Sequence, residues 1–191
     1  MTIKIKMKLL SDAVFGSGIS VPGGEDISIL CDCYGFPYYK GSTFKGIFRE
    51  ELIRYLGWKG NTEQEIAQKT ERLLGKSGDT YLEDHDKITF ADFTLPPIVR
   101  ESILDEIDAE HPELVTDSLS HIRMFTKLDE DGLVEEGSLR SCRCVNKNLI
   151  YYSQINCREE DRELIEDVLK LVKWVGSMRN RGFGKVQLSV I

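Results

Sequence analysis

The chain has 191 residues, of which 41% are hydrophobic, and it carries a formal net charge of −7 with a pI near 5.1. This length suits one sizeable domain, and the acidic balance argues against a free-standing protein that binds nucleic acid through its overall charge. No apolar run is long enough to span a bilayer, and residues 1–6 alternate too strictly for a signal peptide. We therefore expect a cytoplasmic protein with no membrane partner.

The first half of the chain alternates strand and helix patterns. Residues 2–9 place apolar side chains and lysines in turn, the period-two pattern of a half-buried strand. Residues 16–26 hold too many Gly and Pro for a regular element and predict a loop that delivers Asp26. Apolar residues at three- and four-residue spacing then predict a helix over 43–56 and a second, surface helix over 62–74.

The second half repeats this order after an insertion. The patterns predict a strand over 87–95, an acidic helix over 98–109 and a long hairpin that pairs 119–127 with 138–145. A strand over 148–156, a helix over 159–175 and a closing strand over 184–191 follow. This order, in which two strand-helix-strand units are separated by an insertion, predicts an α+β chain with a ferredoxin-like core.

Residues 36–49 combine features that suit a bound phosphate. An aromatic strand is expected to run through Gly41 into a helix that is capped by Ser42 or Thr43, which leaves backbone N–H groups at the positive end of the helix dipole. Positive side chains surround this turn: Lys40, Lys45 and Arg49. The alternative is an ordinary capped helix. A nucleotide-hydrolysing loop is excluded, because Gly46 is followed by Ile47 instead of lysine.

A second basic segment lies near the C-terminus. Residues 176–185 place Arg179, Arg181 and Lys185 among glycines, which let a backbone approach a sugar-phosphate chain closely. Glycine alone would also explain a helix end followed by a tight turn. Because a turn does not need the three positive charges, we predict that this loop also binds single-stranded RNA.

The cysteines and histidines have weaker patterns. Five cysteines without a signal peptide predict reduced thiols. Cys31 with Cys33, and Cys142 with Cys144, would form a four-thiolate zinc site only if their strands met, and zinc sites commonly use wider spacing. The alternative is that these are small buried residues. The three histidines, His85, His111 and His121, show no ligand or nucleophile spacing and are expected to be surface polar residues.

Three motifs together resemble a known family. In the first, a glycine-containing segment is followed by two aspartates six residues apart and then by the 36–49 turn. In the second, a basic segment precedes an aspartate and, further on, a Gly-x-Leu sequence. In the third, a helix precedes an Arg-Gly-Phe-Gly-Lys sequence. The matching stretches are Phe15-Gly-Ser-Gly18, Asp26-Ile-Ser-Ile-Leu-Cys-Asp32, Pro37 through Arg49, His121 through Leu139, and Gly176 through Val186. The chain resembles the RAMP superfamily, specifically the repeated backbone subunit of type III CRISPR effector complexes.

The resemblance implies one RAMP domain over 1–191, with an RRM-like palm and with finger and thumb insertions at about 57–86 and 96–147. It implies an antiviral role in which the subunit binds guide RNA (crRNA) and target RNA and assembles with copies of itself and other subunits of the complex. The RNA-binding residues implied are Lys40, Ser42, Thr43, Lys45, Arg49, Arg123, Arg179, Arg181 and Lys185.

The same resemblance implies that Asp26 cuts target RNA with Mg²⁺ or Mn²⁺, by placing the metal or activating the ribose 2′-hydroxyl. The sequence departs from the family at Ser28, where proline is usual, and at the shortened turn Cys33-Tyr34-Gly35. Alternatives are that Asp26 only caps its loop, in a non-catalytic structural subunit, or that the chain is an acidic interaction module unrelated to RNA. Asp32 is expected to brace the turn that follows it.

Overall fold

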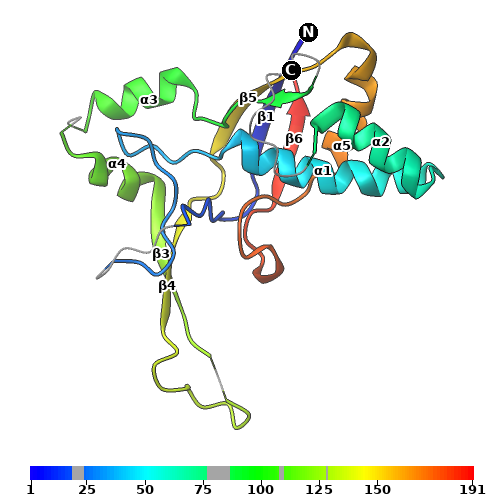
Figure 1. Cartoon of the computed structure of the whole chain (residues 1–191). Coiled ribbons are helices and arrows are strands. Elements are labelled where there is room, and N and C mark those ends of the chain that lie inside the picture. Colours follow the sequence, from blue (N-terminus) through cyan, green and yellow to red (C-terminus); the bar gives the residue numbers. More distant parts are fainter. Residues whose placement is uncertain (19–23, 77–86, 108–109, 128) are drawn as a thin grey trace.

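The computed structural model describes residues 1–18, 24–76, 87–107, 110–127 and 129–191. Strands β1 (Thr2–Leu9), β2 (Thr89–Phe90), β5 (Ile150–Asn156) and β6 (Val186–Val190) form one sheet in the order β2-β5-β1-β6 (Figure 1). Every neighbouring pair in this sheet is antiparallel. The fold is therefore α+β, as the sequence predicts.

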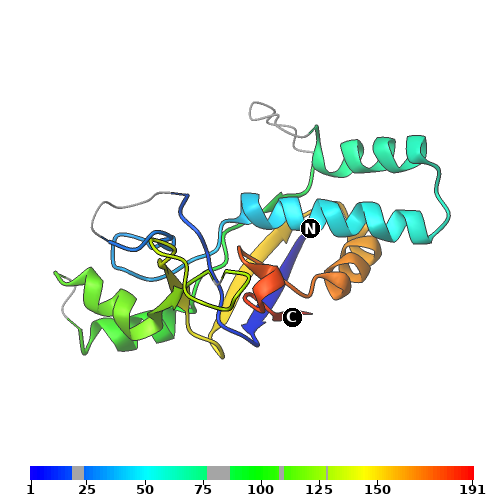
Figure 2. The ribbon, with the colours of Figure 1, turned by 90° about the horizontal axis from the view of Figure 1, so that it is seen from below.

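Helices follow the two central strands. Helix α1 (Gly41–Trp58) comes after β1, and α5 (Arg162–Leu171), preceded by a 3₁₀ turn at Glu159–Asp161, comes after β5. Helix α2 (Glu63–Leu74) runs alongside α1 (Figure 2). The Thr62 side chain and Glu65 form a reciprocal capping box that satisfies donors at the start of α2. The predicted helix over 62–74 is thereby confirmed.

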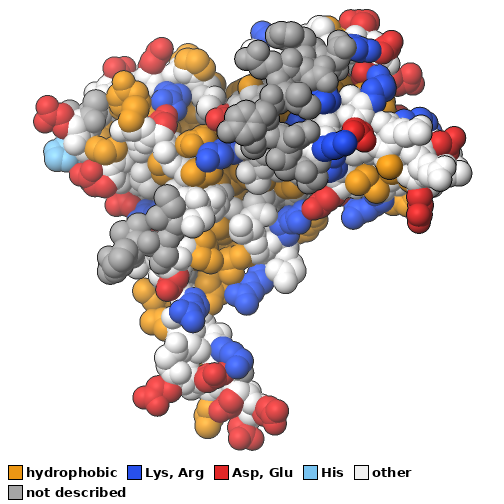
Figure 3. All heavy atoms as spheres, in the orientation of Figure 1, with side chains coloured by type: hydrophobic (Ala, Val, Ile, Leu, Met, Phe, Trp, Pro, Cys, Tyr) orange, Lys and Arg blue, Asp and Glu red, His pale blue; other side chains and the backbone are white. Residues whose placement is uncertain are grey.

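The segment between β2 and β5 forms a separate lobe. It contains α3 (Pro97–Leu104), α4 (Pro112–Leu119) and a hairpin of β3 (Ser120–Phe125) with β4 (Arg140–Val145), which extends away from the sheet (Figure 1). The hairpin tip is acidic (Figure 3), with exposed side chains at Asp129, Glu130, Asp131, Glu135 and Glu136. The predicted pairing of 119–127 with 138–145 is confirmed within the described residues.

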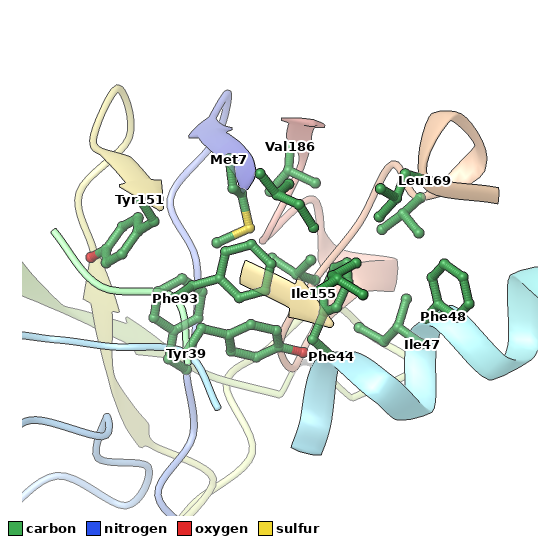
Figure 4. Packing of buried hydrophobic residues seen from close by; sticks show 14 of the residues in the cluster. Met7, Tyr39, Phe44, Ile47, Phe48, Phe93, Tyr151, Ile155, Leu169 and Val186 are labelled. Atoms are coloured by element: carbon green, nitrogen blue, oxygen red, sulfur yellow. The ribbon is translucent and has the colours of Figure 1, made fainter. Parts of the chain in front are cut away.

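The core lies between one sheet face and the helices. Ile3, Ile5, Met7 and Leu9 of β1 all point inward and are at most 3% exposed. They face a layer of aromatic and aliphatic side chains from α1, α5 and the 91–95 segment (Figure 4). Phe44 lies 4.7 Å from the ring of Phe93, centroid to centroid. This packing holds the start of α1 against the sheet.

Four predicted elements differ from the structure: one strand is not formed, and another strand and two helices are shorter than expected. Residues 36–40 form only isolated bridges, Cys31 with Pro37 and Tyr39 with Phe93, so the aromatic strand is wrong. The strand over 87–95 is a ladder only at Thr89–Phe90, because Phe93 turns to pair with Tyr39.

The helix over 159–175 ends at Leu171, since Lys173 and Val175 instead bond to Val186 and Gly184. The acidic helix over 98–109 ends at Leu104. Residues 19–23, 77–86, 108–109 and 128, including His85, lie outside the described residues.

Within the described ranges, no helix has both the length and the apolar character that crossing a bilayer requires.

Candidate nucleic-acid interface

The start of α1 differs from the capped turn that the sequence predicts. Lys40 occupies the N-cap position and makes no side-chain capping bond, so the prediction that Ser42 or Thr43 caps the helix is wrong. The Gly41 N–H donates instead to Asp92 Oδ1 at 2.8 Å, and the Phe44 N–H to the Lys40 carbonyl. Ser42 and Thr43 lie exposed in the first turn, where N–H groups have no partner within the helix. Two such donors therefore face solvent beside Lys40.

The next turn of α1 carries Lys45 and Arg49. The Arg49 Nη2 donates to the carbonyls of Leu74 and Gly75 at 3.3 and 2.9 Å, so this guanidinium binds the C-terminal end of α2. Burial first, and then the positive charges of Arg49 and Lys87, lower the pKa of Lys45. An anion near Lys45 would relieve that repulsion, whereas an anion at Arg49 would compete with two backbone carbonyls.

We expect Arg49→Ala to destabilise the fold by about 1 kcal/mol, because it removes two hydrogen bonds from the C-terminal carbonyls of α2. Lys45→Ala, one turn away, should change stability by less than about 0.5 kcal/mol. Urea denaturation of both variants measures the difference. Equal unfolding free energies for the two would contradict the assignment of Arg49 to the end of α2.

The loop over 176–185 is fixed to α1. The Gly176 N–H donates to the Tyr39 hydroxyl at 3.3 Å, and Arg179 Nη1 lies 3.7 Å from Glu50 Oε2 of α1. Within the loop, residues Arg179–Arg181 form a 3₁₀ turn. The basic 179–185 loop thus contacts α1, the helix that also carries Lys45 and Arg49.

The same loop packs against the base of the hairpin. Phe183 is buried in a small cluster with Val14, Cys142 and Cys144, and its ring lies 5.9 Å from that of Phe125 on β3. The Arg181 guanidinium lies 5.7 Å from the Phe125 ring centroid. A groove of about 480 Å³ opens here between loop and hairpin, lined by residues that include Arg181, Arg140, Lys127, Glu135 and Glu136.

Arg123 projects from β3 beside this loop. Its guanidinium lies 5.4 Å from the Phe183 ring centroid, and Nη2 lies 3.4 Å from Asp12 Oδ2. The same carboxylate faces His121 Nε2 at 3.6 Å, while His121 Nδ1 lies 2.7 Å from Asn146 Oδ1. His121 is therefore part of a polar network beneath the loop and not only the surface residue that we expect from the sequence.

Asp26 lies alongside the start of β4. Its Oδ2 accepts hydrogen bonds from the Ser141 N–H at 2.7 Å and the Ser141 hydroxyl at 3.1 Å, and its Oδ1 lies 3.8 Å from Arg140 Nη1. The Ser141 backbone bond most of all, followed by its hydroxyl, holds the pKa of Asp26 below the ordinary value. The carboxylate is thus ionised near neutral pH and still exposed along one edge.

A pH titration tests this contact. Because the folded-state pKa of Asp26 lies below that of the unfolded chain, its contribution to stability is present above about pH 4 and is lost as the pH falls through the folded-state value. We expect the Ser141 amide proton resonance to move upfield on acidification, with a midpoint below about 4. A midpoint at or above that value would contradict the contact.

The 25–27 segment is held by residues that the sequence did not single out. Glu25 pairs with Arg143 of β4, whose guanidinium also reaches Asp117 of α4 and the Ser120 hydroxyl. Ile27 bridges to Cys142. No local pattern reveals this network, because its members lie on three separate stretches of the chain. It fixes the backbone on either side of Asp26.

The turn after Asp32 is braced as the sequence predicts. Asp32 Oδ1 accepts the N–H groups of Tyr34 and Phe36, and Oδ2 lies 2.6 Å from Arg100, which also stacks on the Phe36 ring. Among the aromatic residues that precede α1, Phe36 and Tyr39 are buried and Tyr38 is partly exposed, so only Tyr38 is placed to stack on a base.

The described residues contain no group of three or more His, Cys, Asp or Glu side chains that would hold a metal ion. Cys142 and Cys144 are buried in the cluster with Phe183, while Cys33 is exposed. A divalent ion at Asp26 would thus have one protein carboxylate and would need RNA phosphates as further ligands, an arrangement that Mg²⁺ commonly adopts.

The fold agrees with the comparisons to known proteins. The model of the RAMP superfamily matches residues 6–187, so the chain belongs to the RAMP superfamily. No curated protein matches it. It is similar in structure to a chain of type III-B Cmr-beta bound to cognate target RNA, with TM-score 0.72 and 14% identity over 100% of this chain and 97% of that chain.

A chain of type III-B Cmr-beta in the apo state is similar as well, with TM-score 0.70, 15% identity and the same coverage. At these identities the likeness establishes the shared fold.

Proposed function

We propose that this protein is a guide-RNA-binding backbone subunit of a type III CRISPR effector complex. The observation that carries the proposal is the contact of the 176–185 loop with both α1 and the hairpin, which brings Arg123, Arg179 and Arg181 together around this loop. Figure 3 shows Lys and Arg side chains where the body meets the hairpin. The structural likeness to a chain of a complex bound to target RNA supports this role.

The arrangement of the sheet supports a ferredoxin-like palm. Strand order β2-β5-β1-β6, with α1 after β1 and α5 after β5, is the β-α-β-β-α-β connectivity of that fold. On this assignment, α2 belongs to an insertion at about 57–86. The lobe of α3, α4 and the hairpin belongs to an insertion at about 96–147, whose hairpin would be the thumb. The thumb would contact the guide–target duplex through exposed Ile122 and Met124.

We further propose that Asp26 takes part in cutting target RNA. Its carboxylate lies beside Ser141 and Arg140 at the start of β4, ionised and partly exposed, where it would hold a divalent ion, Mg²⁺ or Mn²⁺, jointly with RNA phosphates. Such an ion polarises a phosphate and lowers the pKa of an attacking hydroxyl. The chain itself orients the carboxylate, through Ser141, and supplies positive charge nearby, through Arg140.

A second candidate function is a non-catalytic structural subunit of the same complex. The bonds from Asp26 to the N–H and hydroxyl of Ser141 favour it, because they fasten the 25–27 segment to β4 and give the carboxylate a structural use. In that case Asp26 braces the thumb, and another subunit or no subunit cuts the target.

The RNA-binding role is tested by purifying the protein with its native partners from the cytoplasmic fraction, extracting the nucleic acid and sequencing it. Discrete small RNAs with a common repeat-derived end would support the proposal, together with copies of this chain and other effector subunits in the same particle. Purified particles that contain no RNA would overturn it and favour the acidic interaction module.

A further inference from the structure

The outward face of the central sheet has an unusual charge. Strand β1 alternates buried apolar residues with Lys4, Lys6 and Lys8, which point to the face opposite the helices. Lys6 lies between Tyr152 of β5 and Ser189 of β6 in the register of the sheet. Amide side chains surround the same stripe, with Gln154 opposite Lys4, Gln187 opposite Lys8 and Asn156 opposite Thr2.

This face carries positive charge that no Asp or Glu of the sheet offsets. The chain as a whole has 32 acidic residues, yet the four strands β1, β2, β5 and β6 contain three lysines and no Asp or Glu. None of the ion pairs among the described residues includes Lys4, Lys6 or Lys8. Alternate residues of a strand are about 6.7 Å apart, so three like charges repel one another along β1. A bound polyanion would remove that repulsion.

We propose that this open sheet face is a second binding surface for single-stranded RNA. The inference rests on the proposed function as an RNA-binding subunit, but it uses none of the residues assigned there. Lys4, Lys6 and Lys8 would contact successive phosphates, and the partly exposed Tyr152 would stack on a base. The exposed Gln154 and Gln187 amides would hydrogen-bond to the base edges that single-stranded RNA exposes, whereas the Asn156 amide bonds to Thr2 and Thr89.

Single-stranded RNA fits this face better than an acidic protein. A tyrosine in the middle of a lysine stripe offers a flat surface for stacking, and a flat sheet leaves bases accessible on both sides of the stripe. Glutamine and asparagine side chains both donate and accept hydrogen bonds, which suits base edges, whereas carboxylates only accept. An acidic protein partner is nevertheless a distinct outcome that the test below separates.

The test uses the full chain and a photoreactive 4-thiouridine oligonucleotide of about ten nucleotides, a length within the site sizes of single-strand binders. After irradiation, we expect a crosslinked peptide that contains Tyr152. Replacing Lys4, Lys6 and Lys8 together by Gln should weaken binding about tenfold and reduce the slope of log affinity against log salt by about two. Tyr152→Ala should abolish the crosslink without changing the far-ultraviolet circular dichroism.

A matched control carries the same change in net charge elsewhere. Lys59, Lys76 and Lys170, at the end of α1, after α2 and on α5, are exposed and are also replaced together by Gln. This variant should bind RNA within about twofold of the unmodified chain, since electrostatic attraction at a distance is screened by salt. Equal weakening by the two triple variants would overturn the proposal, because only total charge would then matter.

A third variant separates this inference from the proposed function. Arg181→Ala with Lys185→Ala removes charge from the glycine-rich loop, and the crosslink at Tyr152 should persist in it. If RNA binding disappears in this variant while the lysine-stripe variant binds normally, the inference fails and the proposed function stands. If the stripe variant binds RNA normally but loses a protein partner, the face binds an acidic protein and the inference fails. If the unmodified chain binds no RNA, both fail.

Discussion

Replacing Asp26 by asparagine is expected to reduce metal-dependent cleavage of target RNA at least about a hundredfold, with target binding unchanged. Asparagine keeps an oxygen that accepts from the Ser141 N–H and hydroxyl, so the 25–27 segment stays fastened to β4. It removes only the negative charge, which is what a divalent ion or a reacting hydroxyl needs. The effect therefore separates chemistry from structure.

The measurement is cleavage of a labelled complementary RNA by the assembled complex with Mg²⁺ or Mn²⁺, alongside target binding in a chelator. Ser141→Ala is the matched control: it removes the hydroxyl donor but keeps the backbone donor and the Asp26 charge, so it should slow cleavage by less than about tenfold. Full cleavage by the Asp26→Asn complex would refute catalysis by Asp26 and leave the structural subunit as the better assignment.

Gly184→Ala is expected to destabilise the fold by about 3 kcal/mol or more, at or above the upper end of the range for most single substitutions. Gly184 has φ of +75°, and a Cβ there would lie 1.8 Å from the Val175 carbonyl oxygen. The backbone is unable to move away easily, because the Gly184 N–H donates to Asp12 and its carbonyl accepts from Val175, both at 2.8 Å or less. The loop that carries Arg179, Arg181 and Lys185 would lose its position.

Gly182→Ala provides the comparison within the same loop. Gly182 has φ of +86°, but nothing lies within 4 Å of its added Cβ, so the cost is that of the left-handed conformation alone, about 1–2 kcal/mol. Urea denaturation of both variants measures the difference. Similar losses of unfolding free energy would mean that the close approach to Val175 relaxes cheaply, and the account of the loop would be wrong.

Local periodicity was sufficient for most of the fold. The alternation of β1, the apolar spacing of α1 and the capping box of α2 are properties of adjacent residues, so each element is readable from its own stretch of chain. The chain order of strands and helices likewise follows from these patterns. Boundaries were less predictable where a segment pairs with a distant one, as at Leu171, where residues 173–175 leave the helix to bond with 184–186.

The candidate interface depended on contacts between distant residues. The sequence marked Lys40, Lys45, Asp26 and the basic loop, but not what holds them: Asp92 in place of a Ser or Thr cap, and Ser141 at Asp26. Ser141 is 115 positions from Asp26, so no spacing rule connects them. The sequence likewise did not reveal the role of Arg49: its charge and position predict a phosphate ligand, but its guanidinium binds the C-terminal end of α2.

The elements of this RAMP-superfamily protein, their order and the residue types that suit RNA follow from the sequence, because they are encoded in neighbouring positions. Which charged groups remain available, and which of them lie together, depends on the folded chain. Hydrogen bonds and ion pairs form between whatever groups the folded chain brings within reach. Arg123 and Arg181 come together, over the rings of Phe183 and Phe125, only when the hairpin base and the glycine-rich loop pack against each other.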